Sequence, residues 1–181
     1  MLDTTPLTNV YLKANALFEK LEKFVAGLLI SAIVIIVFAN TVARYLLNDP
    51  IFGADRLATY MMVWLGLIGF QIATSKLRHI EIEFLKARVS QSTKCLMNMA
   101  TSILSAAFLG ILFWISFDYL NASIELGDKD IVLKIPLWHI ILILPISFGI
   151  SAIRYFFSIF LWFDAFSGKR QEEEFVTKKL F

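Results

Sequence analysis

Charged side chains beside long apolar stretches are the residues of this sequence that could do chemistry. Arg44 follows the first apolar stretch, Asp55 precedes the second, and Asp118 lies near the end of the third. A charge at membrane depth is costly unless it is paired or reaches water, so such residues mark ion pairs, pathways or contact sites. If the stretches are membrane spans, the three side chains share one depth. Three interpretations stay open: contact with headgroups or water, a structural ion pair of Arg44 with Asp55 or Asp118, or a substrate site.

Arg154 is the only charge in the fourth apolar stretch, and Gln71 lies at a similar depth in the second. The long side chain of Arg154 could snorkel to the membrane interface. Alternatively, its guanidinium could contact a partner helix or an anionic lipid head group. The aromatic residues that follow suit an interfacial belt or a protein contact. The candidate contacts to a partner subunit or to lipid are therefore Arg154, Phe156, Phe160 and Trp162.

The sequence lacks the constellations that catalysis or redox chemistry needs. His79 and His139 are expected at opposite membrane faces, so they cannot share one haem, and the single cysteine, Cys95, cannot form an internal disulfide. No P-loop, metal-spaced cluster or Ser/His/Asp set is present. The net charge of +2 is too small and too scattered for a nucleic-acid-binding stripe. We therefore expect no catalytic residue, metal, cofactor or nucleic-acid partner, and a protein that is not an enzyme.

Four apolar stretches position these residues. With 58% hydrophobic and 18% charged residues, the chain is more apolar than a soluble domain, in which about a quarter of residues are charged. A membrane-spanning helix needs about 20 mostly apolar residues. The sequence predicts four such helices, at residues 24–43, 57–74, 96–120 and 136–163. Pro145 predicts a kink in the fourth, because it removes a backbone hydrogen bond. No acidic residue lies centrally in any span, so the predicted interior has no inward polar track.

The Lys and Arg residues predict the orientation. Twelve lie in residues 1–23, 75–95 and 164–181, and four lie in the connections 44–56 and 121–135. Positive residues favour the cytoplasmic side, so both chain ends are predicted to be cytoplasmic. The expected fold is a single all-α membrane domain, residues 1–181, with four transmembrane helices.

Two segments outside the spans have the pattern of interfacial helices. Apolar and charged residues recur at helical spacing over residues 9–23, which predicts an amphipathic helix in the headgroup plane within the N-terminal segment 1–23. Residues 80–89, in the cytoplasmic connection 75–95, are a second candidate with poorer periodicity. Residues 164–181 are expected to be a cytoplasmic tail.

One run of short motifs resembles a known family. Arg44-Tyr45 ends the first span, Asp55 opens the second, a Trp-Leu-x-x-x-Gly run follows at residues 64–69, and His79-Ile80 begins the cytoplasmic connection. This run resembles the small membrane subunit, of DctQ type, of tripartite ATP-independent periplasmic (TRAP) transporters. The four-span layout is also similar to that family. The chain has the single acid Asp55 where the family often has paired glutamates.

The resemblance implies a scaffold subunit in the bacterial inner membrane. In such transporters a large multi-span permease subunit carries the substrate and sodium sites, and a periplasmic binding protein delivers an organic anion such as a carboxylate. The small subunit would pack on the large one, contact lipids, and help to dock the binding protein. The candidate contacts for docking are the charged residues predicted outside the membrane: Arg44, Asp49, Asp55, Arg56, Asp128, Lys129 and Asp130. The alternative is the membrane anchor subunit of an electron-transfer enzyme, which would bind haem or quinone.

Overall fold

Helices account for most of the chain that the computed structural model describes, residues 5–75 and 91–166. Within those residues the β pairing is one isolated bridge, between Lys129 and Pro136. The elements are α1 (Thr5–Val42), the π-helix η1 (Ala43–Leu47), α2 (Ala54–Ser75), α4 (Gln91–Leu126), α5 (Trp138–Ile141) and α6 (Ile143–Phe166).

Four helical stretches are long and apolar enough to cross a membrane, as the sequence predicts. They are Ala14–Leu47, Ala54–Ser75, Leu96–Leu126 and Trp138–Phe160. The prediction of an all-helical, four-span protein is thus confirmed for the described residues, while the direction of crossing stays a prediction. Following that prediction, we name the end with residues 43–53 and 127–137 the outer end, and the opposite one the inner end.

The first helix is longer than the predicted span. It runs from Thr5 to Val42 without a break, so residues 9–23 do not form a separate helix. Their placement in the headgroup plane stays a prediction. The candidate helix at 80–89 and the tail from residue 167 lie outside the described residues.

The last span is interrupted near its outer end. α5 ends at Ile141 and α6 begins at Ile143. Pro145 has no N–H to donate, and a proline ring clashes with the carbonyl four residues earlier, here that of Ile141. The kink predicted from Pro145 is therefore present, about one turn before the proline.

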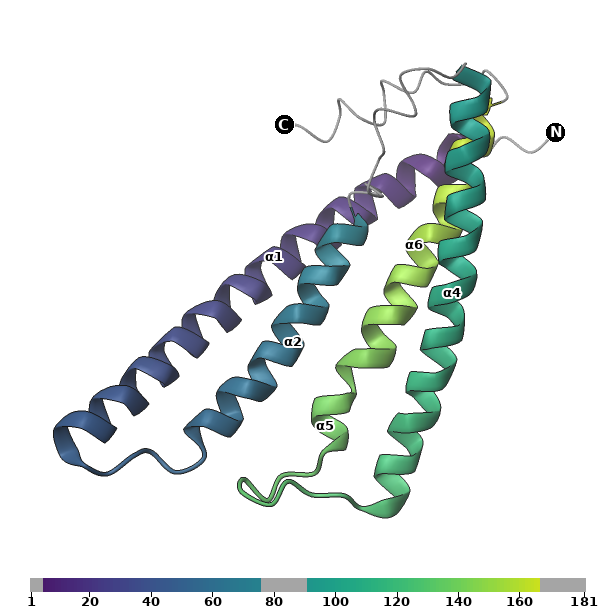
Figure 1. The fold of residues 1–181 in the computed structure, drawn as a ribbon. Helices are drawn as coiled ribbons and strands as arrows, with labels where there is room; N and C mark the ends of the chain where they lie inside the picture. Colours follow the sequence, from purple (N-terminus) through teal and green to yellow (C-terminus); the bar gives the residue numbers. More distant parts are fainter. Residues whose placement is uncertain (1–4, 76–90, 167–181) are drawn as a thin grey trace.

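The four long helices stand in a row. α2 packs against α1 on one side and α6 on the other, and α6 packs along α4. Figure 1 shows this order across the molecule, with α5 continuing α6 toward the outer end. Since α1–α2 and α4–α6 are each a hairpin of neighbouring spans, the contact between α2 and α6 joins the two hairpins. We call this contact the central seam.

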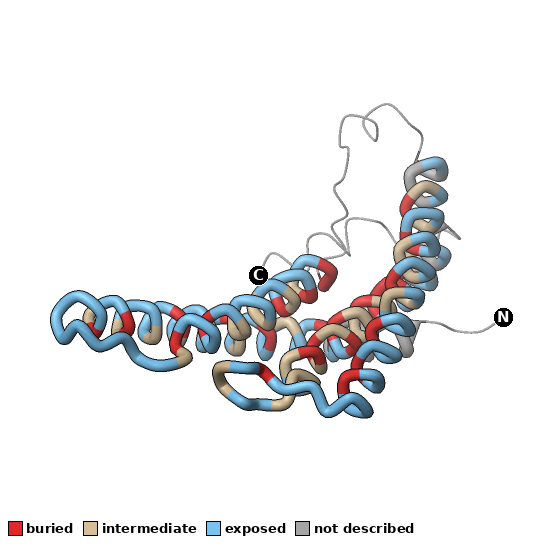
Figure 2. The backbone as a smooth tube through the Cα atoms, turned by 60° about the horizontal axis from the view of Figure 1, so that its bottom comes forward, coloured by how far each residue is buried: buried red, intermediate tan, exposed pale blue. Residues whose placement is uncertain are grey.

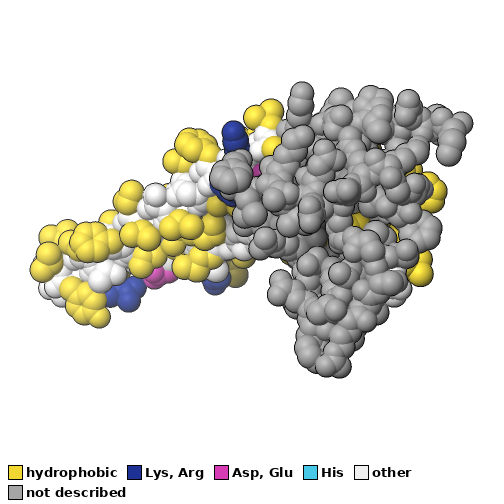
Figure 3. Space-filling view, turned by 90° about the horizontal axis from the view of Figure 1, so that it is seen from above, with side chains coloured by type: hydrophobic (Ala, Val, Ile, Leu, Met, Phe, Trp, Pro, Cys, Tyr) yellow, Lys and Arg dark blue, Asp and Glu magenta, His cyan; other side chains and the backbone are white. Residues whose placement is uncertain are grey.

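A row of helices buries little apolar surface of its own. Figure 2 shows the buried positions as narrow stripes, with much of α1, α2 and α4 exposed. The buried apolar cluster consists of Ala26, Ile68 and Ile143, with partly buried neighbours. Figure 3 shows hydrophobic side chains over the arm that α1 and α2 form. Exposed apolar surface of this extent is typical of a protein that lipid or a partner covers.

Candidate functional site

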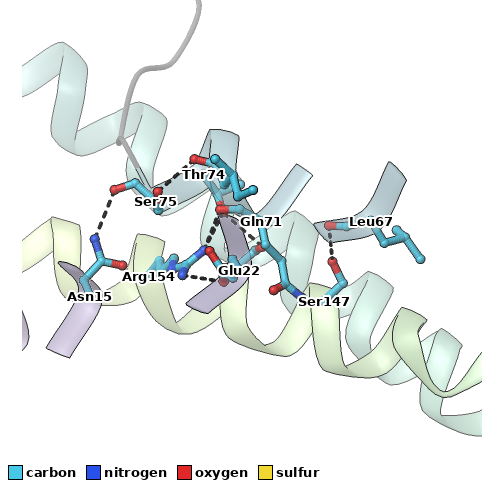
Figure 4. Close-up of polar contacts among 10 residues, drawn as sticks. Asn15, Glu22, Leu67, Gln71, Thr74, Ser75, Ser147 and Arg154 are labelled. Carbon is cyan, nitrogen blue, oxygen red and sulfur yellow. Dashed lines mark hydrogen bonds and ion pairs between the residues drawn. The ribbon is translucent and has the colours of Figure 1, made fainter. Parts of the chain in front are cut away.

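Buried polar side chains gather around Arg154 at the inner end of the central seam. The Arg154 side chain donates from Nη2 to Glu22 Oε1 of α1 at 2.7 Å, and from Nη1 to the Gln71 carbonyl of α2 at 2.5 Å. Figure 4 shows these side chains meeting between α1, α2 and α6. We call the set the inner polar cluster, and its members are Asn15, Glu22, Gln71, Thr74, Ser75, Ser151 and Arg154.

Two further contacts complete this cluster. Asn15 Nδ2 of α1 donates to the Ser75 carbonyl of α2 at 3.1 Å. The hydroxyls of Thr74 and Ser151 lie 3.2 Å apart across the central seam. Each of the three helices is thus bonded to another through side chains that the membrane would otherwise penalise.

The buried ion pair of Arg154 and Glu22 depends on neighbouring hydrogen-bonding groups for its stability. Removing a charge from water costs several kcal/mol, which attraction offsets only when the remaining polar atoms are also bonded. Arg154 gains the Gln71 carbonyl and lies 3.4 Å from Thr74 Oγ1. Glu22 Oε2 and Gln71 Nε2, in contrast, are buried without a hydrogen-bond partner among the described residues. Loss of either charged partner would leave the other as an unpaired charge in the cluster.

Serines on the same face of α6 extend the polar contacts along the helix. Ser147, Ser151 and Ser158 are fully buried. Ser147 donates to the Leu67 carbonyl of α2 at 3.1 Å, and Ser158 donates to Ser102 Oγ of α4 at 2.9 Å. Small residues at contacts between membrane helices permit a close approach of the backbones. α6 therefore contacts both neighbours through its short polar side chains.

The inner end is more polar inside than the sequence predicts, although its buried side chains form a cluster and not a track along the spans. The spacing of residues 9–23 puts Glu22 on a charged face, but α1 continues into the span and this position meets α6. The sequence alternatives for Arg154 place its guanidinium at an interface or against a partner, whereas the structure buries it within the chain. The signal that could have found the cluster is the helical spacing of Ser147, Ser151 and Arg154 in an otherwise apolar span.

The outer end of α1 has a second, more exposed polar group. Asn40 Nδ2 donates to Asp55 Oδ1 at 2.9 Å, and Asn40 Oδ1 accepts the Ile51 N–H at 2.9 Å. Arg44 Nη2 donates to Asp55 Oδ2 at 3.2 Å. Of the two partners that the sequence leaves open for Arg44, the structure selects Asp55, while Asp118 is exposed on α4.

The loop of residues 127–137, which we call the outer loop, is organised by Asp130. Asp130 Oδ1 accepts the backbone N–H groups of Val132 at 2.9 Å and Leu133 at 2.6 Å, and Oδ2 accepts the Tyr60 hydroxyl of α2. The bonds from the Leu133 N–H and the Tyr60 hydroxyl lower the pKa of Asp130 below its usual value. The carboxylate therefore stays ionised at neutral pH and fixes the outer loop to the first hairpin.

The remaining predicted site residues are not brought together into one site. Asp130 is buried and occupied by the loop, so it is not available as a surface contact. Phe156 and Phe160 are exposed on α6 and stack edge-to-face on each other, and Trp162 is partly buried. The predicted outer residues with exposed side chains are Arg44, Asp49, Asp55, Arg56, Asp128 and Lys129.

The buried polar side chains described above hold the helices together by forming hydrogen bonds between them. In residues 5–75 and 91–166, no group of three or more His, Cys, Asp or Glu side chains could hold a metal ion. The buried polar atoms mostly bond to one another across helices. The chemistry that remains for other molecules lies on the exposed surfaces.

Comparison with known proteins identifies related chains. The model of a family described as "Tripartite ATP-independent periplasmic transporters, DctQ component" matches residues 33–165. The sialic acid TRAP transporter permease protein SiaT of Haemophilus influenzae is 29% identical over 99 residues, which are 55% of this chain and 16% of the relative. The isethionate TRAP transporter permease protein DctMQ of Oleidesulfovibrio alaskensis is 26% identical over 162 residues, which are 84% of this chain and 24% of the relative.

A third relative is described as a small permease protein. The C4-dicarboxylate TRAP transporter small permease protein DctQ of Vibrio cholerae is 30% identical over 67 residues, which are 37% of this chain and 29% of the relative. In each of these three matches the chain covers less than a third of the relative's length.

Proposed function

Since this chain belongs to the family of DctQ components of TRAP transporters, we propose that it is a non-catalytic scaffold for the permease subunit that moves the substrate. As a member of that family it is a small permease protein of the inner membrane. The scaffold role is more specific than membership of this family. It is carried by one observation, that the buried polar side chains bond to one another across three helices instead of lining a path.

The exposed surfaces support two proposed partners. The large permease subunit would cover part of the apolar surface, for which Phe156 and Phe160 are candidates because they are exposed and belong to the predicted fourth span, residues 136–163. A periplasmic binding protein would meet the outer end, where Arg44, Asp49 and Lys129 are exposed. Both assignments follow the predicted orientation, with both chain ends in the cytoplasm.

The proposed cargo is an organic anion, such as a carboxylate, imported with sodium coupling in the large subunit. The names of the three relatives refer to sialic acid, isethionate and C4-dicarboxylates, which are all organic anions. No observation favours the alternative of a membrane anchor for an electron-transfer enzyme.

Reconstitution of the transporter tests this function. We expect substrate uptake into liposomes with the binding protein, the large subunit and this chain together, and strongly reduced uptake when this chain is left out. The chain alone should give no uptake. Uptake by the chain alone, or undiminished uptake in its absence, would contradict the scaffold role.

A further inference from the structure

The outer loop presents a large apolar side chain, Ile131, to its surroundings. Ile131 is 91% exposed, the highest value among the large hydrophobic residues described. The next two residues are less exposed. Val132 and Leu133 are partly buried, and the Leu133 side chain packs against Gly53 of the other hairpin. Ile131 is therefore far more exposed than the other apolar side chains of the loop, of which Ile135 is 37% exposed.

Backbone bonds across the outer loop hold this tip in place. The Asp130 N–H donates to the Ile135 carbonyl at 2.9 Å, and the Lys134 N–H donates to the Asp130 carbonyl at 3.0 Å. At the base of the loop, the Leu137 N–H donates to the Asp128 carbonyl at 2.9 Å. Together with the Asp130 side chain, these bonds order the loop before any contact forms. A preorganised loop loses less conformational entropy on binding than a flexible one.

The surroundings of Ile131 favour water over lipid. The outer loop lies between Leu126, where one candidate span ends, and Trp138, where the next begins. Exposed charged residues flank the tip within the loop, and they are Asp128, Lys129 and Lys134. Charges so close to the tip would resist its insertion among acyl chains. A strongly exposed apolar side chain with charged residues around it has the layout of a protein–protein anchor and its polar border.

We propose that Ile131 is the anchor residue on which the secreted binding protein of the transporter docks, inserting into an apolar pocket of that protein. This proposal rests on the proposed function, which assigns the outer end to the periplasm and the binding protein to it. The charged residues around the tip would then guide the approach, while Ile131 supplies the buried contact.

A binding measurement tests the anchor. The complex of this chain with its large subunit, in nanodiscs, is titrated with the binding protein. We expect Ile131→Ser to weaken binding by at least about tenfold and Ile131→Leu to stay within about threefold of the wild type. Leu126→Ser is the matched control, because Leu126 is also exposed, 75%, at the base of the same loop, and it should leave binding unchanged.

The outcomes separate this proposal from the function on which it rests. Equal binding of the wild type and Ile131→Ser would overturn the anchor and leave the docking role of the outer end intact. Absence of binding by the wild-type complex would contradict the docking role itself, and the anchor with it.

A fluorescent probe distinguishes the binding protein from other occupants. Cys95 is the only cysteine of this chain, so Cys95→Ser with Ile131→Cys gives this chain one site for an environment-sensitive dye. In vesicles that hold the complex, we expect water-like emission that shifts to shorter wavelength when the binding protein is added. A short-wavelength emission before that addition would show that lipid or the large subunit covers the tip, and would overturn the proposal.

Discussion

The two ends of the central region use similar polar groups in opposite surroundings. At the inner end, the side chains of Arg154 and Glu22 are 4% and 8% exposed and 2.7 Å apart. At the outer end, those of Arg44 and Asp55 are 54% and 74% exposed and 3.2 Å apart. Water screens the outer pair, so its contribution to stability is small. The inner pair has lost its hydration and is bonded to protein groups instead, so removal of one partner is strongly destabilising. The comparison shows that burial, more than the identity of the ions, decides what an ion pair does for this fold.

The largest effect should come from breaking the inner pair. We expect Arg154→Ala to lower the free energy of unfolding by about 3–5 kcal/mol, because Glu22 then stays buried without its counter-ion. Unfolding by denaturant in detergent micelles measures this. The double change Arg154→Met with Glu22→Leu should recover most of the loss, since it removes both buried charges. Equal losses for the single and double variants would contradict the buried-charge explanation.

An intermediate effect is expected where the outer loop meets α2. Gly53 and Gly127 have positive φ angles of 77° and 65°, and an added Cβ would overlap the Leu133 side chain at Gly53 but meet open space at Gly127. Gly53→Ala and Gly127→Ala should share a backbone cost of about 1–2 kcal/mol. Gly53→Ala should cost roughly 1 kcal/mol more, because Leu133 must move. The difference in thermal unfolding between the two variants reports the contact of the hairpins, and no difference would show that this contact contributes nothing.

The smallest effect is expected at the exposed outer pair. Arg44→Ala should change the unfolding free energy by at most about 1 kcal/mol, and less at high salt. Asn40→Ala is the instructive contrast, because Asn40 is buried and bonds to both Asp55 and the Ile51 N–H. We expect it to cost about 1–2 kcal/mol. A larger loss of unfolding free energy for Arg44→Ala than for Asn40→Ala would contradict the conclusion that burial decides how much a polar contact stabilises this fold.

Local sequence patterns predict the spans because twenty apolar residues in a row have few alternatives in a membrane protein. The break near Pro145 is equally local, since it follows from one missing N–H and one ring. The inner polar cluster depends instead on contacts between residues far apart, such as Glu22 and Arg154. Its charges have the same spacing as residues on a water-facing surface, and Glu22 meets Arg154 only because α1, α2 and α6 come together at the inner end.

The exposure of Ile131 was beyond local prediction for a similar reason. The sequence of the outer loop predicts charged contacts at Asp128, Lys129 and Asp130, yet the backbone bonds of the loop turn Asp130 inward and leave the isoleucine outside. The hydrogen bonds of a turn determine where its side chains point. These bonds involve backbone carbonyl and N–H groups, which nearly all residue types carry, so residue types alone do not predict them.

Because the row of helices leaves much apolar surface exposed, the stability of this chain depends on the concentration of a partner that covers that surface. A partner that binds only the folded row raises its apparent stability by RT ln(1 + [L]/Kd), which is about 2.7 kcal/mol when the partner is present at a hundred times its Kd. With most of its apolar side chains outside its own core, the chain gains stability in proportion to the logarithm of the partner's concentration in the membrane. In the proposed complex, a shortage of the large subunit would then lower the stability of this chain.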